Sequence, residues 1–197
     1  METRPCQNCK NNFTIEPDDF LFYEKMGVPA PTFCPECRLI RRLSFRNEKT
    51  LYRNEGQKCK TSVVSVYPKD SGVVVYCRPC WWGDGWEGAE YGRDFDESKS
   101  FLSQFQNLLK STPLPSLFGI YTTLVNSEYT NMVTDLKNCD MLTHSDLDEN
   151  CLYGSVVDIC KDSVDNLILS DSELCYETVD CQKCYQVMYS VDCEDCH

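Results

Sequence analysis

The sequence lacks any long apolar run and carries little positive charge in its second half. No segment approaches the roughly 18 consecutive apolar residues of a membrane-spanning helix, and METRPCQNCK at the start has no apolar core of a secretory signal. We therefore expect a cytoplasmic protein with no part in a membrane. Residues 121–197 contain 3 Lys or Arg against 16 Asp or Glu, which disfavours nucleic acid or a membrane surface as the partner of this part.

Histidine is scarce, with 2 residues, whereas cysteine is abundant, with 15. Thiols in the cytosol stay reduced, and an odd number of cysteines cannot pair completely. We therefore expect metal ligands or buried thiols in place of a disulfide framework. No group of His and Glu residues near the cysteines indicates a hydrolase, so we expect a protein that is not an enzyme.

Four cysteines near the N-terminus have the spacing of a zinc site. Cys6 and Cys9 form one C-x-x-C pair, and Cys34 and Cys37 form a second pair after 24 intervening residues. Two such pairs present four thiolates to one tetrahedral ion from two tight turns. The spacing therefore predicts a closed zinc site made of these four residues.

The residues around these pairs predict a strand and a short helix. Phe13 and Ile15 alternate with polar residues, as in a strand. Leu39, Ile40 and Leu43 follow helical spacing, so a helix should begin at the second cysteine pair, where its N-terminus favours thiolate over thiol. A knuckle, a hairpin and a helix that carries the second ligand pair form a treble-clef arrangement.

Residues 4–46 resemble a bacterial domain family described as a probable zinc ribbon. The likeness lies in CQNCKNNF, in the turn YEKMG and in CPECRLIRR. The family pattern has a lysine where this chain has Met26, and Lys25 stands one residue earlier. The resemblance implies zinc binding by the four cysteines and no known activity. The wider chain is similar to uncharacterised cysteine-rich proteins of candidate-phyla bacteria.

The predicted helix also presents a basic face. Residues at helical spacing on this face are Arg38, Arg41, Arg42 and Arg46. They are candidates for binding a phosphate or another anion. A solvated face, or ion pairs with the acidic C-terminal part, is the alternative that we favour, because residues 1–60 have only 11 basic against 8 acidic residues.

A second cysteine group has three members, Cys59, Cys77 and Cys80, around a predicted hairpin over 61–77. Zinc takes four ligands, and Asp84 is our candidate for the fourth. Weaker candidates are Ser62, Asp70, His144 and water. We interpret the group as a structural zinc site, while an open site of the catalytic type stays the alternative.

The next segment combines an aromatic run with an amphipathic helix. We expect Trp81, Trp82, Trp86, Tyr91 and Phe95 to form a small core beside the zinc site, because four acidic residues among them disfavour base stacking. An apolar stripe follows at Phe101, Leu102, Phe105, Leu108 and Leu109, after a capping Ser98 or Ser100. This helix should bury its stripe on the neighbouring module.

From residue 121 the cysteines recur in steps that alternate between 12 and 9. One series is Cys139, Cys151, Cys160, Ser172, Cys181 and Cys193, and the other, three residues later, is Leu142, Gly154, Ser163, Cys175, Cys184 and Cys196. The two steps together predict a 21-residue repeat. Small or apolar residues at every step are typical of inward columns in a parallel β-solenoid, and the Asn and Asp residues just before them suit its corners.

The last residues, CEDCH, match the attachment motif of a c-type haem, and Cys181/Cys184 with Cys193/Cys196 match a zinc spacing. All four cysteines fall in the small-residue columns, whose earlier members include serine and glycine. We therefore interpret them as buried thiols and expect no haem. A metal site in this tail is the alternative.

These observations predict a mainly β protein with small helical content. The expected parts are a zinc-ribbon or treble-clef module at 1–56, a second zinc hairpin at 57–97, a helix and junction at 98–120, and an acidic solenoid at 121–197. The helix at 98–111 or the aromatic run would cover the start of the solenoid, and its open C-terminal end would promote self-association. The predicted function is a zinc-binding, non-enzymatic interaction or scaffold protein holding two zinc ions. The alternative is a nucleic-acid-binding zinc protein that uses the basic helix at 38–53.

Overall fold

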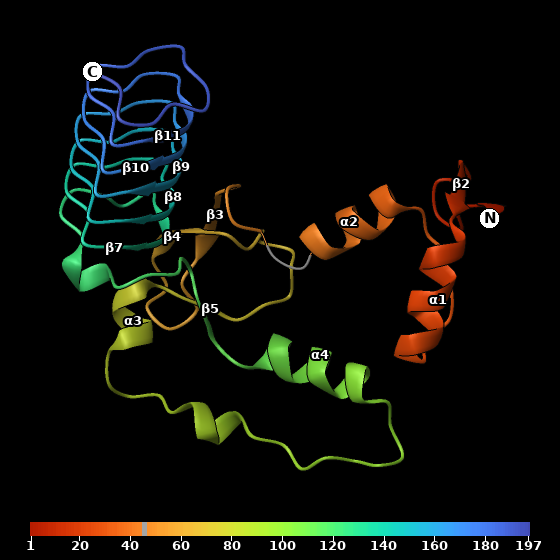
Figure 1. Cartoon of the computed structure of the whole chain (residues 1–197). Coiled ribbons are helices and arrows are strands. Elements are labelled where there is room, and N and C mark those ends of the chain that lie inside the picture. Colours follow the sequence, from red (N-terminus) through yellow and green to blue (C-terminus); the bar gives the residue numbers. More distant parts are fainter. Residues whose placement is uncertain (45–46) are drawn as a thin grey trace. The chain divides into compact units, whose positions relative to one another are not determined.

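The computed structural model describes residues 1–44 and 47–197 (Figure 1). The chain divides into two compact units, Met1–Asn47 and Glu48–His197, and each is described by itself. Arg46, one of the candidate anion-binding residues, lies outside the described residues. Within the described part, no helix combines the length and the apolar character that crossing a bilayer requires.

The first unit contains a hairpin and two helices. Strands β1 (Glu2–Pro5) and β2 (Asn12–Ile15) pair antiparallel, which confirms the strand expected around Phe13. Helix α2 (Pro35–Leu43) begins at Cys34, as predicted. The buried residues of this unit are Cys6, Phe13, Ile15, Cys34 and Cys37.

Helix α1 (Pro17–Met26) was not predicted. Its start carries clear signals: Pro17 occupies the first turn, and Glu16 and Asp19 form a reciprocal capping box. Gly27 ends it in the left-handed conformation, with φ of 64°. These local signals outweigh the weak apolar periodicity of the segment, and none of the residues of the helix is buried.

The second unit begins with another hairpin, of β3 (Tyr52–Glu55) and β4 (Ser62–Ser65). The predicted pairing of residues 61–67 with 73–77 is wrong, because β4 pairs with the preceding strand. Strand β5 (Val75–Tyr76) instead pairs in parallel with β6 (Leu114–Pro115). The predicted module boundary at 56/57 therefore falls inside the turn of this hairpin.

Short helices connect β5 to the solenoid. They are α3 (Arg78–Trp82), the 3₁₀ turn η1 (Gly88–Tyr91), α4 (Phe101–Ser111) and a second 3₁₀ turn, η2 (Tyr121–Thr123). Ser100 caps α4 by accepting a hydrogen bond from the backbone N–H of Ser103, as predicted. The expectation that α4 buries its apolar stripe is wrong, since Phe101 and Leu102 are 64% and 74% exposed.

The C-terminal part is a parallel β-solenoid, which confirms the predicted fold class. Its strands, stacked in chain order in Figure 1, are β7 (Asn131–Thr134), β8 (Thr143–Asp146), β9 (Ser155–Asp158), β10 (Leu167–Ser170) and β11 (Val179–Gln182). Asn131 pairs with Thr143, Thr143 with Ser155, and Ser155 with Leu167. Each coil therefore contains 12 residues, and the 21-residue period is not the length of a coil.

The coil is assembled from three-residue steps. Every third side chain points inward and is almost fully buried, in the order Val133, Leu136, Cys139, Leu142, Ser145, Asp148 and Cys151. The residue before each inward position has a positive φ, as at Asn138 (55°) and Asn150 (56°). Because 12 and 9 are both multiples of three, the predicted series stayed on inward positions although its period was not that of the coil.

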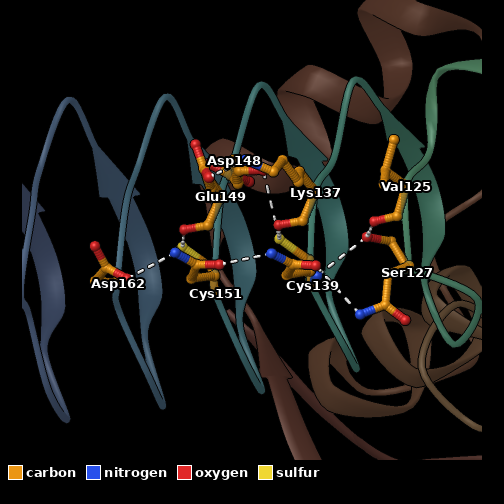
Figure 2. Close-up of polar contacts among 11 residues, drawn as sticks. Val125, Ser127, Lys137, Cys139, Asp148, Glu149, Cys151 and Asp162 are labelled. Atoms are coloured by element: carbon orange, nitrogen blue, oxygen red, sulfur yellow. Dashed lines mark hydrogen bonds and ion pairs between the residues drawn. The ribbon is translucent and has the colours of Figure 1, made fainter.

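Asparagine and aspartate occupy many of these left-handed positions, which they tolerate better than most residues. In successive coils, Asn126 Nδ2 donates to Asn138 Oδ1 at 3.2 Å, and Asn138 Nδ2 donates to Asn150 Oδ1 at 3.0 Å. Asn150 Nδ2 then donates to Asp162 Oδ1 at 2.8 Å (Figure 2). The Asn and Asp residues that the sequence places at the corners thus also form a ladder of side-chain hydrogen bonds between coils.

Polar inward side chains bind the backbone of the next coil. Ser127 Oγ accepts a hydrogen bond from the N–H of Cys139 at 3.0 Å. Ser163 Oγ accepts one from the N–H of Cys175 at 3.2 Å. Each of these bonds spans 12 residues, so a buried hydroxyl finds its partner without water.

The start of the solenoid contacts α3 and the residue that begins the second unit. The Arg78 guanidinium donates to the carbonyl oxygen of Thr130, and Asn131 Nδ2 donates to the carbonyl oxygen of Glu48 at 2.9 Å. Gly119 pairs with Val133, and a Cβ at Gly119 would lie 2.2 Å from the Val133 oxygen. A glycine is required there, since any side chain would push the two backbones apart.

Left-handed positions occupied by β-branched residues should be strained. Ile159 has a φ of 58° and is 55% exposed. We expect Ile159→Asn to raise the free energy of unfolding by about 1 kcal/mol, because asparagine tolerates this conformation better. Ile159→Thr removes similar apolar surface but keeps the β-branch, so it should not stabilise. Chemical denaturation measures both variants, and equal effects would show that strain is not the cause.

Asp148 should make stability depend on pH. It is 1% exposed, its Oδ1 accepts a hydrogen bond from the N–H of Cys160 at 2.9 Å, and its Oδ2 has no hydrogen-bond partner among the described residues. Burial raises the pKa of this carboxyl to about 8, although the Cys160 N–H opposes the shift. The unfolded pKa is about 3.9, so the native state binds the extra proton between these values. Stability should therefore fall by up to about 5 kcal/mol as the pH rises from about 4 to about 8.

The variant Asp148→Asn keeps an acceptor for Cys160 but cannot ionise. It should match the wild type near pH 4 and exceed its stability progressively towards pH 8, as measured by denaturant titrations across the range. Asp180→Asn, at an exposed left-handed position, is the matched control and should leave the slope unchanged. A constant offset between Asp148→Asn and the wild type would contradict this role.

Candidate metal centres

The first cysteine cluster brings together all four predicted ligands. Cys6 and Cys9 lie in the turn between β1 and β2, Cys34 is the N-cap of α2, and Cys37 lies in its first turn. The four Sγ atoms all lie within 4.8 Å of one another, and those of Cys9 and Cys34 are 3.8 Å apart. Tetrahedral zinc with Zn–S bonds of about 2.3 Å places its sulfurs about 3.8 Å apart, so the cluster fits this ion.

Donors surround these sulfur atoms. The N–H of Cys34 donates to Cys6 Sγ at 3.2 Å, and the N–H of Cys37 donates to Cys34 Sγ at 3.4 Å. Asn8 Nδ2 also donates to Cys37 Sγ, at 3.5 Å. Such donors stabilise negative charge on sulfur, which is the form that binds a metal.

The thiol pKa values reflect this environment. Burial raises the pKa of Cys6, but backbone N–H groups of Cys34, Cys9 and Asn8 outweigh it and lower the value to about 6. For Cys9, the N–H of Asn11 lowers the pKa, but burial and the three neighbouring thiols together raise it to about 12. Four thiols this close cannot all ionise unless a cation balances their charge.

The second cluster contains the three predicted cysteines. The Sγ atoms of Cys59, Cys77 and Cys80 lie within 4.8 Å of one another, and those of Cys59 and Cys77 are 3.7 Å apart. Thr61 Oγ1 lies 2.9 Å from Cys59 Sγ. The hydroxyl and the N–H of Thr61 lower the pKa of Cys59 to about 7, whereas burial raises that of Cys77 to about 12.

Asp84 is not brought to this cluster. Among residues 1–44 and 47–197, the cluster has no fourth member of the types Cys, His, Asp or Glu. Helix α3 ends at Trp82, and Gly83 continues in an extended conformation, while the Asp84 carbonyl oxygen accepts a hydrogen bond from Lys58 Nζ at 3.0 Å. His144, a weaker candidate, instead lies 2.8 Å from the Glu48 carboxylate.

The two clusters are assembled on the same local backbone. In the first turn, the N–H of Cys6 donates to the Asn11 carbonyl at 2.9 Å. In the second, the N–H of Gly56 donates to the Thr61 carbonyl, also at 2.9 Å. Gly56 therefore occupies the position of Cys6.

Other backbone angles around the two clusters are also similar. Lys10 and Lys60, one residue after the cysteine of each turn, have φ of 67° and 59°. Cys34 and Cys77 each precede a helix with nearly equal backbone angles, φ −61° and ψ 161° against φ −62° and ψ 157°. The sequence carried a signal for this likeness in CQNCK and GQKCK, which the C-x-x-C pattern alone did not detect.

The basic face lies on α2. Arg41 and Arg42 are exposed and Arg38 is half-buried. The guanidinium carbon of Arg41 lies 5.5 Å from the centre of the Phe33 ring, an arrangement typical of a cation–π contact. One face of the Arg41 guanidinium therefore packs against a residue of the same unit.

The aromatic run forms a small cluster next to the second cysteine group. Trp86 contacts Trp81, Tyr76 and Tyr91, with ring centres 4.5, 5.6 and 6.3 Å apart, and its Nε1 donates to the Trp81 carbonyl at 2.8 Å. The predicted aromatic core is confirmed for this part. Trp82 and Phe95 do not belong to it, since they are 58% and 60% exposed.

The solenoid cysteines make a different kind of contact. Cys139 Sγ donates to the carbonyl oxygens of Lys137 and Asp148, at 3.4 and 3.5 Å. Ser163 Oγ donates to the carbonyl oxygen of Lys161 at 2.9 Å, again two residues earlier. Cysteine and serine therefore replace one another in these columns, because both are small and both donate to the carbonyl oxygen two residues earlier.

The C-x-x-C pairs of the tail do not gather into a metal site. Cys181 and Cys184 are buried, and Cys184 Sγ donates to the Gln182 carbonyl at 3.2 Å. Cys193 and Cys196 of the CEDCH motif occupy the next coil and make the same bond two residues back, at 3.7 and 3.5 Å. Over the described residues, the only metal-competent groups are those of the two knuckles.

Comparisons of the chain with models of protein families, with curated proteins and with solved structures find no match. The class is therefore defined by the fold and the clusters alone. The chain is a mainly β, cysteine-rich protein with a parallel β-solenoid and two cysteine groups that could hold metal ions.

The hydrogen-bonding role of the solenoid thiols predicts which substitutions they tolerate. Cys139→Ser keeps a donor of similar size and should change the free energy of unfolding by less than about 1 kcal/mol. Cys139→Leu should cost about 1–3 kcal/mol or more, because the inward column has no room for extra methylenes. Thermal unfolding of the metal-loaded protein measures both. A greater loss for serine than for leucine would show that the thiol acts only as an apolar filler.

Proposed function

We propose that this chain is a zinc-binding, non-enzymatic scaffold protein. Zinc ions at the two cysteine clusters hold the knuckles in shape, and the solenoid supplies the surface for assembly. The single observation that carries the zinc part is the gathering of Cys6, Cys9, Cys34 and Cys37 within 4.8 Å. The resemblance of residues 4–46 to a probable zinc-ribbon family supports the same proposal.

The donor set favours zinc. Thiolates select zinc and other soft or borderline metals over magnesium and calcium. Four sulfurs brought together by one knuckle turn and one helix N-terminus, with backbone N–H donors to two of them, are typical of a structural zinc site. A metal in this place would organise the turn and the start of α2 and would take no part in a reaction.

The first unit depends on such a metal for its stability. Over its described residues, 1–44 and 47, three of the five buried side chains are the ligands Cys6, Cys34 and Cys37. Helix α1 has no buried residue, and Leu39, Ile40 and Leu43 of α2 are 47%, 57% and 69% exposed. An apolar core this small does not stabilise a unit of this length without a metal or a crosslink.

The outer surface of the solenoid supports an assembly role. Exposed apolar residues recur 12 apart, so they stack on successive coils: Tyr129, Met141 and Tyr153 form one row, and Leu147 and Ile159 form another. The first row borders a cavity of about 480 Å³ that Lys49 and Leu51 also line. Contiguous apolar surface on a soluble protein is typical of a contact surface.

Nucleic-acid binding is the second candidate. The exposure of Arg41 and Arg42 on α2 favours it. The excess of acidic residues in the solenoid opposes it, since a nucleic acid would be repelled from most of the second unit. We therefore keep the scaffold role as the proposal.

Metal content tests the zinc proposal. Elemental analysis of the purified, reduced protein should find about two zinc ions per chain, one for each cysteine cluster. The double variant Cys34→Ser/Cys37→Ser should lose one of them and expose the first unit to protease, because its core consists largely of metal ligands. The double variant Cys181→Ser/Cys184→Ser, at inward thiols of the solenoid, is the matched control and should keep both ions. A third equivalent of zinc, or none, would contradict the assignment.

Light scattering of the zinc-loaded protein tests the assembly role separately. The proposal expects a mass above that of one chain at micromolar concentration, and a reduced mass for Tyr153→Glu, which places a charge in the apolar row. A strict monomer in the absence of other proteins would rule out self-association as the use of this surface.

A further inference from the structure

The second cluster is a copy of the first with one ligand replaced by glycine. Gly56 takes the position of Cys6, and Cys59, Cys77 and Cys80 take the positions of the other three cysteines. Tetrahedral zinc takes four ligands. Among the described residues, Cys, His, Asp and Glu supply only three ligands to this cluster, which leaves a fourth position for another ligand.

The surroundings of Gly56 match those of a sulfur ligand. A Cβ at Gly56 would lie 3.7 Å from the backbone nitrogen of Cys77. In the first cluster, the equivalent nitrogen, that of Cys34, donates to Cys6 Sγ at 3.2 Å. The second cluster therefore keeps a backbone N–H beside the place where the first holds a thiolate.

The cysteines of the copy are partly exposed. Cys59, Cys77 and Cys80 are all half-buried, whereas in the first cluster Cys9 is exposed and the other three cysteines are buried. The Cys59 Sγ would lie 2.7 Å from a Cβ on Gly56, so this thiol, the end of a flexible side chain, leans into the space beside the glycine. Val63 Cγ1 would lie 3.3 Å from the same Cβ, so a donor enters this space as the Cys59 and Val63 side chains shift.

We propose that the second cluster binds its metal through three thiolates and takes an external thiolate as an exchangeable fourth ligand. This inference rests on the proposed metal-binding function. A thiolate is the class indicated because the same position in the first cluster is a thiolate held by the same backbone N–H. On binding, the sulfur lone pair forms the bond to the metal, the thiol proton passes to solvent, and a coordinated water leaves.

Cobalt(II) substitution tests this inference, because sulfur-to-cobalt charge-transfer absorption increases with the number of thiolate ligands. The protein is kept reduced with a phosphine, loaded with two cobalt ions and titrated with 2-mercaptoethanol. The charge-transfer absorbance should rise by about one seventh, as seven thiolate bonds become eight. The rise should saturate and should reverse when the thiol is removed.

Two reciprocal variants serve as matched controls. Gly56→Cys supplies the fourth ligand from the chain, so its absorbance should start at the higher level and should not respond to thiol. Cys6→Gly opens the first cluster in the same way, so its absorbance should rise by about one third, as six thiolate bonds become eight. Each variant changes a single ligand position, and the second one keeps the test valid if the first does not fold.

The outcomes separate the inference from the function on which it rests. Binding of only one cobalt ion by the wild type would show that the second cluster holds no metal, and both would fail. Two bound ions with an absorbance that ignores thiol would overturn the inference and leave the metal-binding function standing. An equal response in Gly56→Cys and the wild type would also overturn it, because the added thiolate would then bind elsewhere.

Discussion

The three-residue step of the solenoid is the constraint on which most of the structure depends. A turn at every third residue makes each coil only 12 residues long and leaves a narrow interior. Inward residues must therefore be small or compactly apolar, and polar ones must reach a backbone partner, as Ser127 and Asp148 do across one coil. The same step forces a positive φ on the residue before each inward position, which explains the abundance of asparagine and aspartate there.

Sulfur has two physical roles in this chain, and the direction of the hydrogen bond distinguishes them. In the first knuckle, backbone N–H groups donate to the sulfurs of Cys6 and Cys34, which favours thiolate and a bound cation. In the solenoid, the Cys160 sulfur donates to the carbonyl oxygens of Asp158 and Leu169, and burial raises the pKa of this thiol to about 12, which favours the neutral form. C-x-x-C spacing alone does not separate these roles, because the three-residue step of the solenoid produces the same spacing.

Local patterns predicted much of the fold and of the first metal site. Cysteine spacing identified the four ligands, Ser100 marked the start of α4, and the small-residue columns identified the solenoid. The errors arose where pairing between segments decides the outcome. Strand β4 pairs with β3 and not with the following strand, and the apolar stripe of α4 remains exposed, since periodicity does not specify which surface receives it. The sequence did not reveal the 12-residue coil, because the predicted series alternated steps of 12 and 9. Its members therefore belong to different inward columns of the solenoid.

The sequence by itself determined which residues can bind a metal and which can line a narrow interior, because thiol chemistry and side-chain size are properties of single residues. Tertiary structure decided which of them meet. It gathered three cysteines at the second knuckle without Asp84, and it placed Gly56 where the first knuckle has Cys6. It also turned the tail cysteines inward towards carbonyl oxygens. These outcomes depend on backbone hydrogen bonds between distant segments, which the order of residues does not show directly.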